Sequence, residues 1–191
     1  KPEVMLFMAH SISRYCPMPC VVFIHDLAFL KFEQYFTQKD LKRLKWITRD
    51  AVHRADVILA PSEATKGDIE QFFPEFSDKI KIVPLGFDER IYYPRGEEEV
   101  EVIKKKYDLT RDYLLHVGAL QPRKNLTCLI EAFEICRDKG DEIDLVLAGG
   151  KGWMSDITLE RVKKSKYAKD IKVLGFVSLE ELPVLYSGAD L

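Results

Sequence analysis

The sequence predicts an α/β protein in which parallel sheets are covered by helices. Short apolar runs bounded by turn residues alternate with longer stretches of helical periodicity along the 191 residues. Most of the short runs are apolar at consecutive positions, as expected for strands that are covered on both faces. The chain is 47% hydrophobic and its net charge is −2. It can therefore bury a core, and it has no overall field that would attract nucleic acid or an anionic membrane.

The first half of the chain contains apolar runs that are typical of buried strands. We expect strands at residues 4–8, 20–24, 57–60 and 80–83. A helix is predicted from Ser62, which can act as its N-cap, to about residue 73. No apolar run is long enough for a transmembrane helix, and the opening residues do not have the pattern of a signal peptide.

A longer helix is predicted over residues 37–54, with Thr37 as its N-cap. It holds six basic and two acidic residues, and its apolar residues recur at helical spacing. One interpretation is that the apolar stripe packs on the sheet and the charged face lies in solvent. Another is that this basic amphipathic helix makes a weak peripheral contact with an anionic membrane. If the stripe packs on the sheet, only the basic face remains for such a contact.

The segment 84–96, "PLGFDERIYYPRG", interrupts the alternation with two prolines and two glycines and is predicted to be an interdomain linker. We therefore expect one domain over residues 1–88, a linker proper over residues 89–96 and a second domain over residues 97–191. Each half has too few strands for a complete doubly wound domain. The expectation is that the chain is an interior part of a larger two-domain protein.

The second half repeats the alternation. A helix over residues 97–106 has glutamates in its first turns and lysines in its last, which is the order that the helix dipole favours. Strands are expected at residues 113–117, 143–148 and 171–174, and residues 186–191 begin another. A helix is predicted from Asn125 onward, and Ser178 with Glu181 forms a capping box for the last helix.

The stretch "VGALQPRKNL" places two cations where a helix is predicted to begin. If the helix starts here, Arg123 and Lys124 lie in its first turn, where the dipole disfavours positive charge. A bound anion such as phosphate would offset this cost, and Gly118 after the preceding strand would allow close approach. The alternative is that both side chains bend into water and the small penalty is tolerated.

Histidines and glycines also follow predicted strands, at the sheet edge where ligands bind in parallel α/β folds. His25 can face the crevice or be a turn residue that is satisfied by backbone, and His10 has a comparable place. His116 lies inside a strand and is expected to be packed. Glycines after two further strands mark either a ligand's approach or tight turns; they are Gly149, Gly150 and Gly175. No dinucleotide, Walker, zincin or hydrolase motif occurs.

Four cysteines are too few for a disulfide framework at this length, which favours a reducing compartment. Cys16 and Cys20 in "CPMPC" lack a second pair of ligands at zinc-finger spacing, so they are interpreted as ordinary small apolar residues. No metal site is predicted.

With these segments placed, the chain resembles the group 1 (family 4) retaining glycosyltransferases of the GT-B fold, which consists of two Rossmann-like domains. The similarity runs in order through six segments: "VVFIHDLAFLKFEQYF", "RADVILAPSEATKGDI", "KIVPLGFD", "HVGALQPRKNLTCLIEAF", "LVLAGGKGW" and "VLGFVSLEELPVLYSGADL". Their order is more specific than any one of them.

The resemblance implies a cytoplasmic hexosyltransferase that moves a sugar from a nucleoside diphosphate sugar to an acceptor hydroxyl, with retention at the anomeric carbon. It implies that Arg123 and Lys124 hold the donor diphosphate, with Gly118 allowing close approach, and that His25 is catalytic, near the reacting sugar. Ser62 would lie at the cleft between the domains. The base would be bound at Gly175, Phe176 and Val177 through backbone contacts. No metal or other cofactor is implied, and the acceptor would be a saccharide, lipid-linked or other hydroxyl compound.

Two parts of the family pattern are not found in this sequence: the acid-x7-acid motif, which would follow Leu191, and a glycine-rich loop that would precede residue 1. The expectation is that these residues alone are inactive. A sugar-nucleotide epimerase of similar fold is an alternative, but it would need catalytic acids that these segments do not supply. A non-catalytic nucleotide-binding or assembly module is another.

Overall fold

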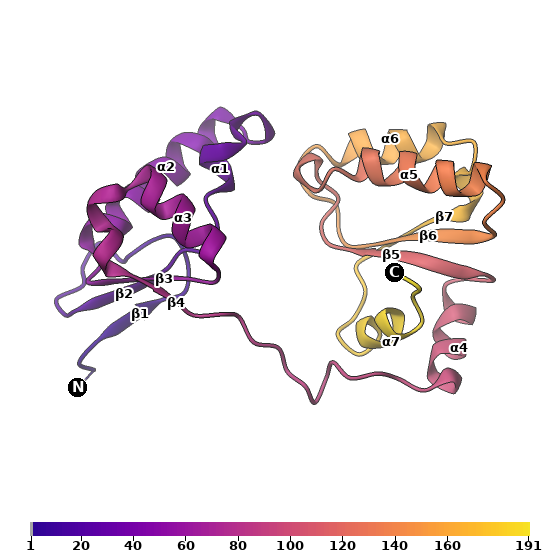
Figure 1. The fold of residues 1–191 in the computed structure, drawn as a ribbon, viewed down its shortest axis with the longest axis horizontal. Helices are drawn as coiled ribbons and strands as arrows, with labels where there is room; N and C mark the ends of the chain where they lie inside the picture. The colour runs from indigo at the N-terminus through magenta and orange to yellow at the C-terminus, as the bar shows by residue number, and fades with distance from the viewer. Residues whose placement is uncertain (1) are drawn as a thin grey trace. The chain divides into compact units, whose positions relative to one another are not determined.

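The computed structural model describes residues 2–191 (Figure 1). The chain divides after Gly86 into two compact units, and the predicted linker, residues 89–96, groups with the second. Each unit is built on its own parallel sheet with its own buried core. This is the α/β architecture that the sequence predicts.

The first unit contains a four-stranded parallel sheet in the order β1-β2-β3-β4. Its strands are β1 (Met5–Phe7), β2 (Cys20–Phe23), β3 (Val57–Ala60) and β4 (Ile80–Ile82). Every strand is added on the same side of the one before it. Since crossover connections are right-handed, such an order places all connecting helices on one face.

Figure 1 shows this arrangement, with the helices of the first unit gathered over one face of its sheet. They are α1 (Ala28–Lys31), α2 (Gln38–Arg54) and α3 (Glu63–Phe72), with 3-10 turns η1 (Glu33–Tyr35) and η2 (Pro74–Lys79). The core between them and the sheet includes Val22, Ile58 and Ile69, each fully buried.

The ends of α2 and α3 follow the predicted capping. The Thr37 side chain accepts a hydrogen bond from the Asp40 backbone N–H, and Ser62 accepts one from Thr65 in the same way. The apolar stripe of α2 packs into the core, where Leu41 and Ala51 are buried. This stripe is therefore not free to enter a membrane. Within residues 2–191, no helix is both long and apolar enough to cross a bilayer.

The second unit contains a three-stranded parallel sheet made of β5 (Asp112–Val117), β6 (Ile143–Ala148) and β7 (Ile171–Gly175), in that order. The chain then returns to β5. The Leu115 N–H donates to the Leu191 carbonyl at 2.7 Å, and the Asp190 N–H donates to the Tyr113 carbonyl at 3.0 Å. These bonds lay residues 190 and 191 along β5, but the predicted strand over residues 186–191 is wrong in its bounds, because Tyr186 and Ser187 belong to the helix α7 (Leu182–Ser187) and no strand is formed after β7 in the described residues.

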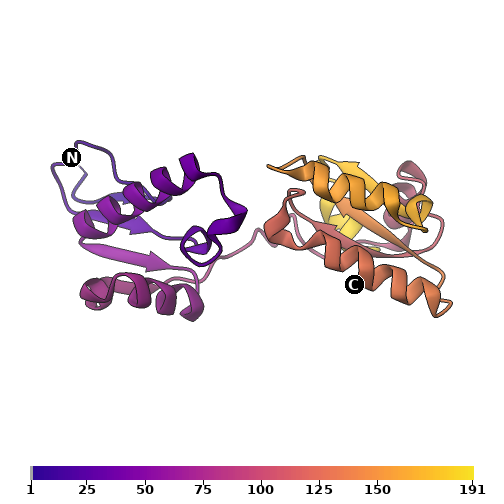
Figure 2. The ribbon, with the colours of Figure 1, turned by 90° about the horizontal axis from the view of Figure 1, so that it is seen from above.

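The chain thus passes to the other side of β5 after β7, and helices cover both faces of this sheet. Figures 1 and 2 show α5 and α6 side by side over one face, and Figure 1 shows α4 and α7 on the other. The helices are α4 (Glu97–Lys106), α5 (Leu126–Asp138), α6 (Ser155–Lys164) and α7 (Leu182–Ser187), with 3-10 turns η3 (Pro122–Lys124) and η4 (Ala168–Asp170). Separate clusters of buried apolar residues fill the two sides.

The helix α5 begins at Leu126, within one residue of the predicted start, but the prediction that Arg123 and Lys124 lie in its first turn is wrong. Asn125 is in the left-handed conformation, with φ 51° and ψ 40°, and it separates α5 from the turn η3. Asparagine reaches this conformation more readily than other non-glycine residues. Arg123 and Lys124 therefore lie in η3, ahead of the helix, and not in its first turn.

The predicted capping box of the last helix is half formed. The Ser178 hydroxyl lies 3.4 Å from the Glu181 N–H, but α7 begins only at Leu182. The Glu181 carboxylate bonds mainly to Lys106 at the end of α4 and to the hydroxyl of Tyr107, which follows α4. Long-range partners therefore share the carboxylate that a local pattern assigned to the cap.

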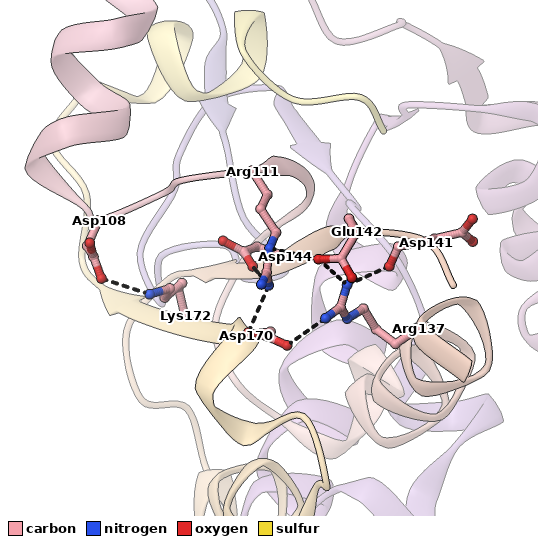
Figure 3. A network of polar contacts seen from close by, with 8 residues as sticks. All are labelled: Asp108, Arg111, Arg137, Asp141, Glu142, Asp144, Asp170 and Lys172. Carbon is pink, nitrogen blue, oxygen red and sulfur yellow. Dashed lines mark hydrogen bonds and ion pairs between the residues drawn. The ribbon is translucent and has the colours of Figure 1, made fainter. Parts of the chain in front are cut away.

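A network of charges lies at the amino end of the second sheet (Figure 3). Arg111 contacts the carboxylates of Asp144 and Asp170 at 3.4 and 3.0 Å, and Arg137 contacts Asp170 at 3.1 Å. The Asp144 side chain is only 3% exposed. Burial raises its pKa, and the positive charge of Arg111 opposes this rise. The network compensates a buried carboxylate at the edge opposite to the carboxyl ends of the strands.

Candidate functional site

The candidate ligand-binding site of the second unit lies at the carboxyl ends of β5, β6 and β7. After β7 the chain passes to the other side of β5, and in open parallel sheets ligands bind beyond the carboxyl ends of the strands where the chain changes direction in this way. Gly118, Gly149 and Gly175 stand at or just after the ends of the three strands. The predicted diphosphate and base residues of this unit therefore come from one edge of one sheet.

Gly118 and Gly149 bring two strand ends into direct contact. Both have positive φ, +152° and +151°. A Cβ atom on Gly149 would lie 2.0 Å from the Gly118 carbonyl oxygen. This distance is too short for any nonbonded contact, so only glycine fits here. Gly150, its neighbour, has open space around a Cβ. Of the two adjacent glycines, only Gly149 is required by the close approach.

A cavity of about 220 Å³ opens at this edge. Its lining comes from the ends of all three strands and from the segment before α7, and it is largely apolar. The lining residues are Val117, Gly118, Ala119, Ala148, Gly149, Phe176, Val177, Leu179 and Leu182. The cavity brings Gly118, predicted for the diphosphate, together with Phe176 and Val177, predicted for the base.

Of the three predicted base-binding residues, Phe176 is the most accessible, with 85% of its surface exposed. Val177 is buried at 9% exposure and packs in the core beside α4 and α7. Gly175 has φ +72°, and its carbonyl accepts a hydrogen bond from the Gly149 N–H at 2.7 Å. That carbonyl is therefore already engaged in holding β6 and β7 together.

Arg123 and Lys124 follow β5 on the turn η3. Lys124 is exposed and Arg123 is half-buried. Within residues 2–191 neither side chain forms a hydrogen bond or an ion pair, whereas most arginines of this unit are paired with carboxylates. Two unpaired cations next to the strand ends are what a phosphate site requires.

Two polar side chains here were not predicted as site residues. The Nε2 atom of His116 and the Oε1 atom of Gln121 are buried without a hydrogen-bond partner among the described residues. Burial lowers the pKa of His116, and the charge of Lys124 lowers it further. His116 points at the close approach, since its Nε2 atom would lie 3.4 Å from a Cβ on Gly118. The available signal was a polar residue inside an apolar strand.

The remaining predicted residues belong to the first unit and lie together there. His25 is exposed after β2, and its Nε2 atom lies 2.9 Å from the Met8 carbonyl oxygen. A carbonyl only accepts, so this nitrogen carries the proton, and Nδ1 of the neutral ring is left as the basic atom. The His10 ring centroid is 6.3 Å away, and burial lowers the pKa of His10.

Ser62 is joined to His25 through one intermediate. Its hydroxyl donates to Oγ1 of Thr65 at 3.3 Å, and Thr65 donates to the His25 carbonyl at 3.3 Å. Thr65 is buried, so this short chain of bonds fixes the backbone that carries His25. Ser62 also caps α3, which is sufficient by itself to explain a serine at this position.

No group of three or more His, Cys, Asp or Glu side chains is placed to hold a metal ion in the described part of the chain.

Comparison with known families agrees with this geometry. Residues 98–191 match the family model described as "Glycosyl transferases group 1", and residues 3–90 match "Glycosyltransferase Family 4". The two models together account for nearly the whole chain. The chain belongs to the group 1 glycosyltransferases, and its two units are of the GT-B type.

Curated relatives carry related names. The chain is 26% identical over 185 residues to the O-antigen chain mannosyltransferase B of Escherichia coli, a match that covers 96% of this chain and 47% of the relative. It is 28% identical over 119 residues to the mannosylfructose-phosphate synthase of Agrobacterium fabrum, covering 59% of this chain and 26% of that protein. The chain thus spans half or less of the length of these relatives.

Solved structures show the same fold. HepE of Anabaena in complex with UDP-glucose superposes with a TM-score of 0.72 at 20% identity, covering 91% of this chain and 45% of that one. A sucrose-phosphate synthase from Thermosynechococcus elongatus superposes with a TM-score of 0.69 at 17% identity, covering 93% of this chain and 44% of that one.

Proposed function

We propose that this protein transfers a sugar from a nucleoside diphosphate sugar to an acceptor hydroxyl, with retention at the anomeric carbon. The observation that carries the proposal is the edge of the second sheet, where two unpaired cations follow a close approach of two glycines. Family membership and the nucleotide-sugar complex of a structural neighbour support it.

In this proposal Arg123 and Lys124 bind the diphosphate of the donor. The bond between the anomeric carbon and the diphosphate breaks, the acceptor oxygen bonds to that carbon, and the acceptor proton passes to the leaving diphosphate. Negative charge grows on the leaving diphosphate, so cations held ready for it lower the barrier. Gly118 carries no side chain that would block the approach of the phosphates, and its own N–H already donates to the Ala148 carbonyl.

The cavity at the same edge of the sheet is proposed to take the nucleotide base, although neither Arg123 nor Lys124 lines it. Phe176 offers an exposed ring and Val177 an apolar wall, while Gly175 shapes the turn between β7 and the segment before α7. The prediction of backbone contacts to the base has to use groups other than the Gly175 carbonyl, which already accepts from Gly149.

His25 is proposed to act near the reacting sugar, with Ser62 at the cleft between the domains. The support from the first unit is the exposure of His25, its fixed tautomer and the bonds from Ser62 through Thr65 that hold its backbone. An acceptor of the saccharide or lipid-linked class fits the proposed reaction. One relative is the O-antigen chain mannosyltransferase B of Escherichia coli.

We further propose that the protein is cytoplasmic and needs no cofactor. The basic face of α2 is proposed to make a weak contact with an anionic membrane. We also propose that these 191 residues alone do not turn over donor, because they span about half the length of the relatives.

Donor binding can be tested by thermal shift and calorimetry with UDP-, GDP- and ADP-sugars. We expect one nucleotide class to raise the melting temperature. Arg123→Ala should weaken its binding by about 10- to 100-fold, because a hydrogen bond to a charged group is typically worth about 1.5–3 kcal/mol. Lys163→Ala, which removes an exposed cation of α6 away from the edge, is the matched control.

The phosphate assignment fails if Arg123→Ala and Lys163→Ala bind every nucleotide as the unsubstituted chain does. It also fails if no nucleotide stabilises the unsubstituted protein while its circular dichroism shows a folded chain.

A further inference from the structure

The connection between β1 and β2 brings two cysteine sulfur atoms together. The Sγ atoms of Cys16 and Cys20 lie 2.9 Å apart. Two thiolates bound to one zinc ion would be separated by about 3.8 Å, given Zn–S bonds of about 2.3 Å in a tetrahedral site. The observed separation is about 0.9 Å shorter than that value and about 0.85 Å longer than the bond of about 2.05 Å that joins two sulfurs in a disulfide, so a small movement would bring the sulfurs to bonding distance.

Local structure holds the pair in this position. The segment "CPMPC" contains Pro17 and Pro19, whose rings fix φ on both sides of Met18. The Met18 carbonyl oxygen lies 3.5 Å from the Cys16 sulfur and 3.3 Å from the Cys20 sulfur. Both thiols therefore turn toward the same side of a short, stiff turn.

The second cysteine is also anchored to the sheet. Cys20 is the first residue of β2, where it stands opposite Met5 of β1. Its N–H donates to the Asp56 carboxylate at 2.8 Å. Since Cys20 cannot move without breaking these bonds, the two sulfurs remain neighbours in the folded chain.

The two thiols differ in access. Cys20 is 4% exposed, and burial together with the neighbouring Cys16 raises its pKa to about 11. The negative charge of Asp56 also contributes to this raised pKa, and the positive charge of Arg54 opposes it. Cys16 is half-buried and open to small molecules. A reagent from solution therefore meets the Cys16 sulfur first, and the Cys20 sulfur lies behind it.

We propose that Cys16 and Cys20 are a reversible dithiol–disulfide pair that exchanges with small-molecule disulfides of the glutathione class. The Cys16 thiolate attacks such a disulfide, forms a mixed disulfide and releases one thiol. The Cys20 thiolate then attacks the Cys16 sulfur, so that the Cys16–Cys20 bond forms and the second thiol leaves. Two electrons pass to the small disulfide, and the two protons end on its two thiols. The same class of thiol in excess reverses the reaction.

A metal site is the competing interpretation of these sulfurs. The Met5 Sδ atom lies 4.0 Å from the Cys16 sulfur, which would supply a third soft ligand. The short separation of the two cysteine sulfurs argues against a shared ion, and the described residues contain no larger group of ligands at this place.

The test is a comparison of alkylation in the full chain before and after treatment with oxidised glutathione. Trypsin releases residues 15–31 as one peptide, which holds both cysteines and no internal Lys or Arg. After iodoacetamide under denaturing conditions, the reduced peptide should carry two alkyl groups. The peptide from the oxidised chain should carry none and lack two hydrogens, and dithiothreitol before alkylation should restore the first pattern.

Three variants and a control with added zinc distinguish the possible outcomes. Cys20→Ser should stop at the mixed disulfide on Cys16, whereas Cys16→Ser should leave Cys20 fully alkylatable. Cys128→Ser, which removes an exposed cysteine of α5, should leave the result unchanged. The proposal is overturned if the oxidised peptide still takes two alkyl groups or if Cys16 bonds to Cys128 or Cys136. It is also overturned if the thiols are protected only by added zinc and released by EDTA.

Discussion

Gly149 shows how one residue decides whether the proposed donor edge can form. The end of β6 touches the Gly118 carbonyl so closely that only a hydrogen atom fits on the Cα of Gly149. The same contact brings Gly118 and Gly149 into the lining of one cavity. A side chain at this position would push the ends of β5 and β6 apart, and the edge would open.

Gly149→Ala should therefore destabilise the second unit by about 3 kcal/mol, because overpacking and a strained backbone each cost about 1–3 kcal/mol. Urea unfolding followed by circular dichroism measures the change. Gly150→Ala is the matched control, since a Cβ there meets nothing within 4 Å. Equal stability of the two variants would show that the contact does not constrain the fold.

His116 shows that a residue predicted only as packing can sit under the site. Its ring lies within β5, and both burial and the charge of Lys124 lower its pKa. Both effects favour the neutral form of the ring. A neutral ring adds no positive charge that would repel Lys124.

At the scale of elements, the turn η3 and the helix α5 divide a segment that looks continuous in the sequence. Asn125 in the left-handed conformation ends η3 and lets α5 begin afresh at Leu126. The cations therefore lie ahead of α5 and not within its first turn, although they remain near the positive end of its dipole. No acidic residue occupies that first turn.

Helices α5 and α6 are joined by a polar contact as well as by the core. The Glu134 carboxylate accepts two hydrogen bonds from Arg161, at 3.0 and 2.6 Å, and one from the Ser165 hydroxyl at 2.5 Å. Both charged side chains are about one-fifth exposed. The bond from Arg161 is the main cause that lowers the pKa of Glu134, and Ser165 adds to it.

A carboxyl whose pKa falls on folding stabilises the folded state fully above its unfolded pKa, here about 4.5, and loses that stabilisation as the pH drops through the folded value. Glu134→Gln should cost about 1–3 kcal/mol at pH 7. The cost should shrink steadily below pH 4.5. Denaturant unfolding from pH 7 to pH 3 measures it.

Glu160→Gln, which changes an exposed glutamate of α6, should have little effect at any pH. If the cost of Glu134→Gln did not change between pH 7 and pH 3, the ion pair would not be its source.

At the scale of the second unit, stability and binding are assigned to opposite edges of one sheet. The charge network of Figure 3 lies at the amino ends of the strands, and the glycines and cations lie at the carboxyl ends. The Asp144 carboxylate is buried and depends on Arg111 for compensation. Removal of the Arg111 guanidinium should therefore weaken the fold without changing the proposed donor site.

Arg111→Met should lower the stability by roughly 1–3 kcal/mol, less than for a fully buried pair because Arg111 is about one-third exposed. Burial raises the pKa of Asp144, so its charged form is the unfavourable one and the loss should grow as the pH rises above about 4. Nucleotide affinity should stay as in the unsubstituted chain at temperatures where the variant is folded. A variant that kept its stability but lost nucleotide binding would contradict this division.

Much of this architecture was predictable because it depends on local patterns. Consecutive apolar runs placed the strands within one residue at most ends, and Thr37, Ser62 and the charge order of residues 97–106 located three helix starts. These signals are carried by a few neighbouring residues. They are less reliable where a distant partner competes: Glu181 was assigned to a cap, but its carboxylate bonds to Lys106 at the end of α4 and to Tyr107 just after it.

The sequence by itself determined the α/β class, the order of the strands and helices, the family resemblance and the presence of a basic pair beyond a strand. Only the tertiary structure decided that the pair precedes α5, that Gly149 and not Gly150 meets Gly118, and that the Cys16 and Cys20 sulfurs are neighbours. The physical reason is range. Periodicity and capping act over a few residues along the chain, whereas close approach, burial and the pairing of side chains depend on residues that meet only when the sheet has formed.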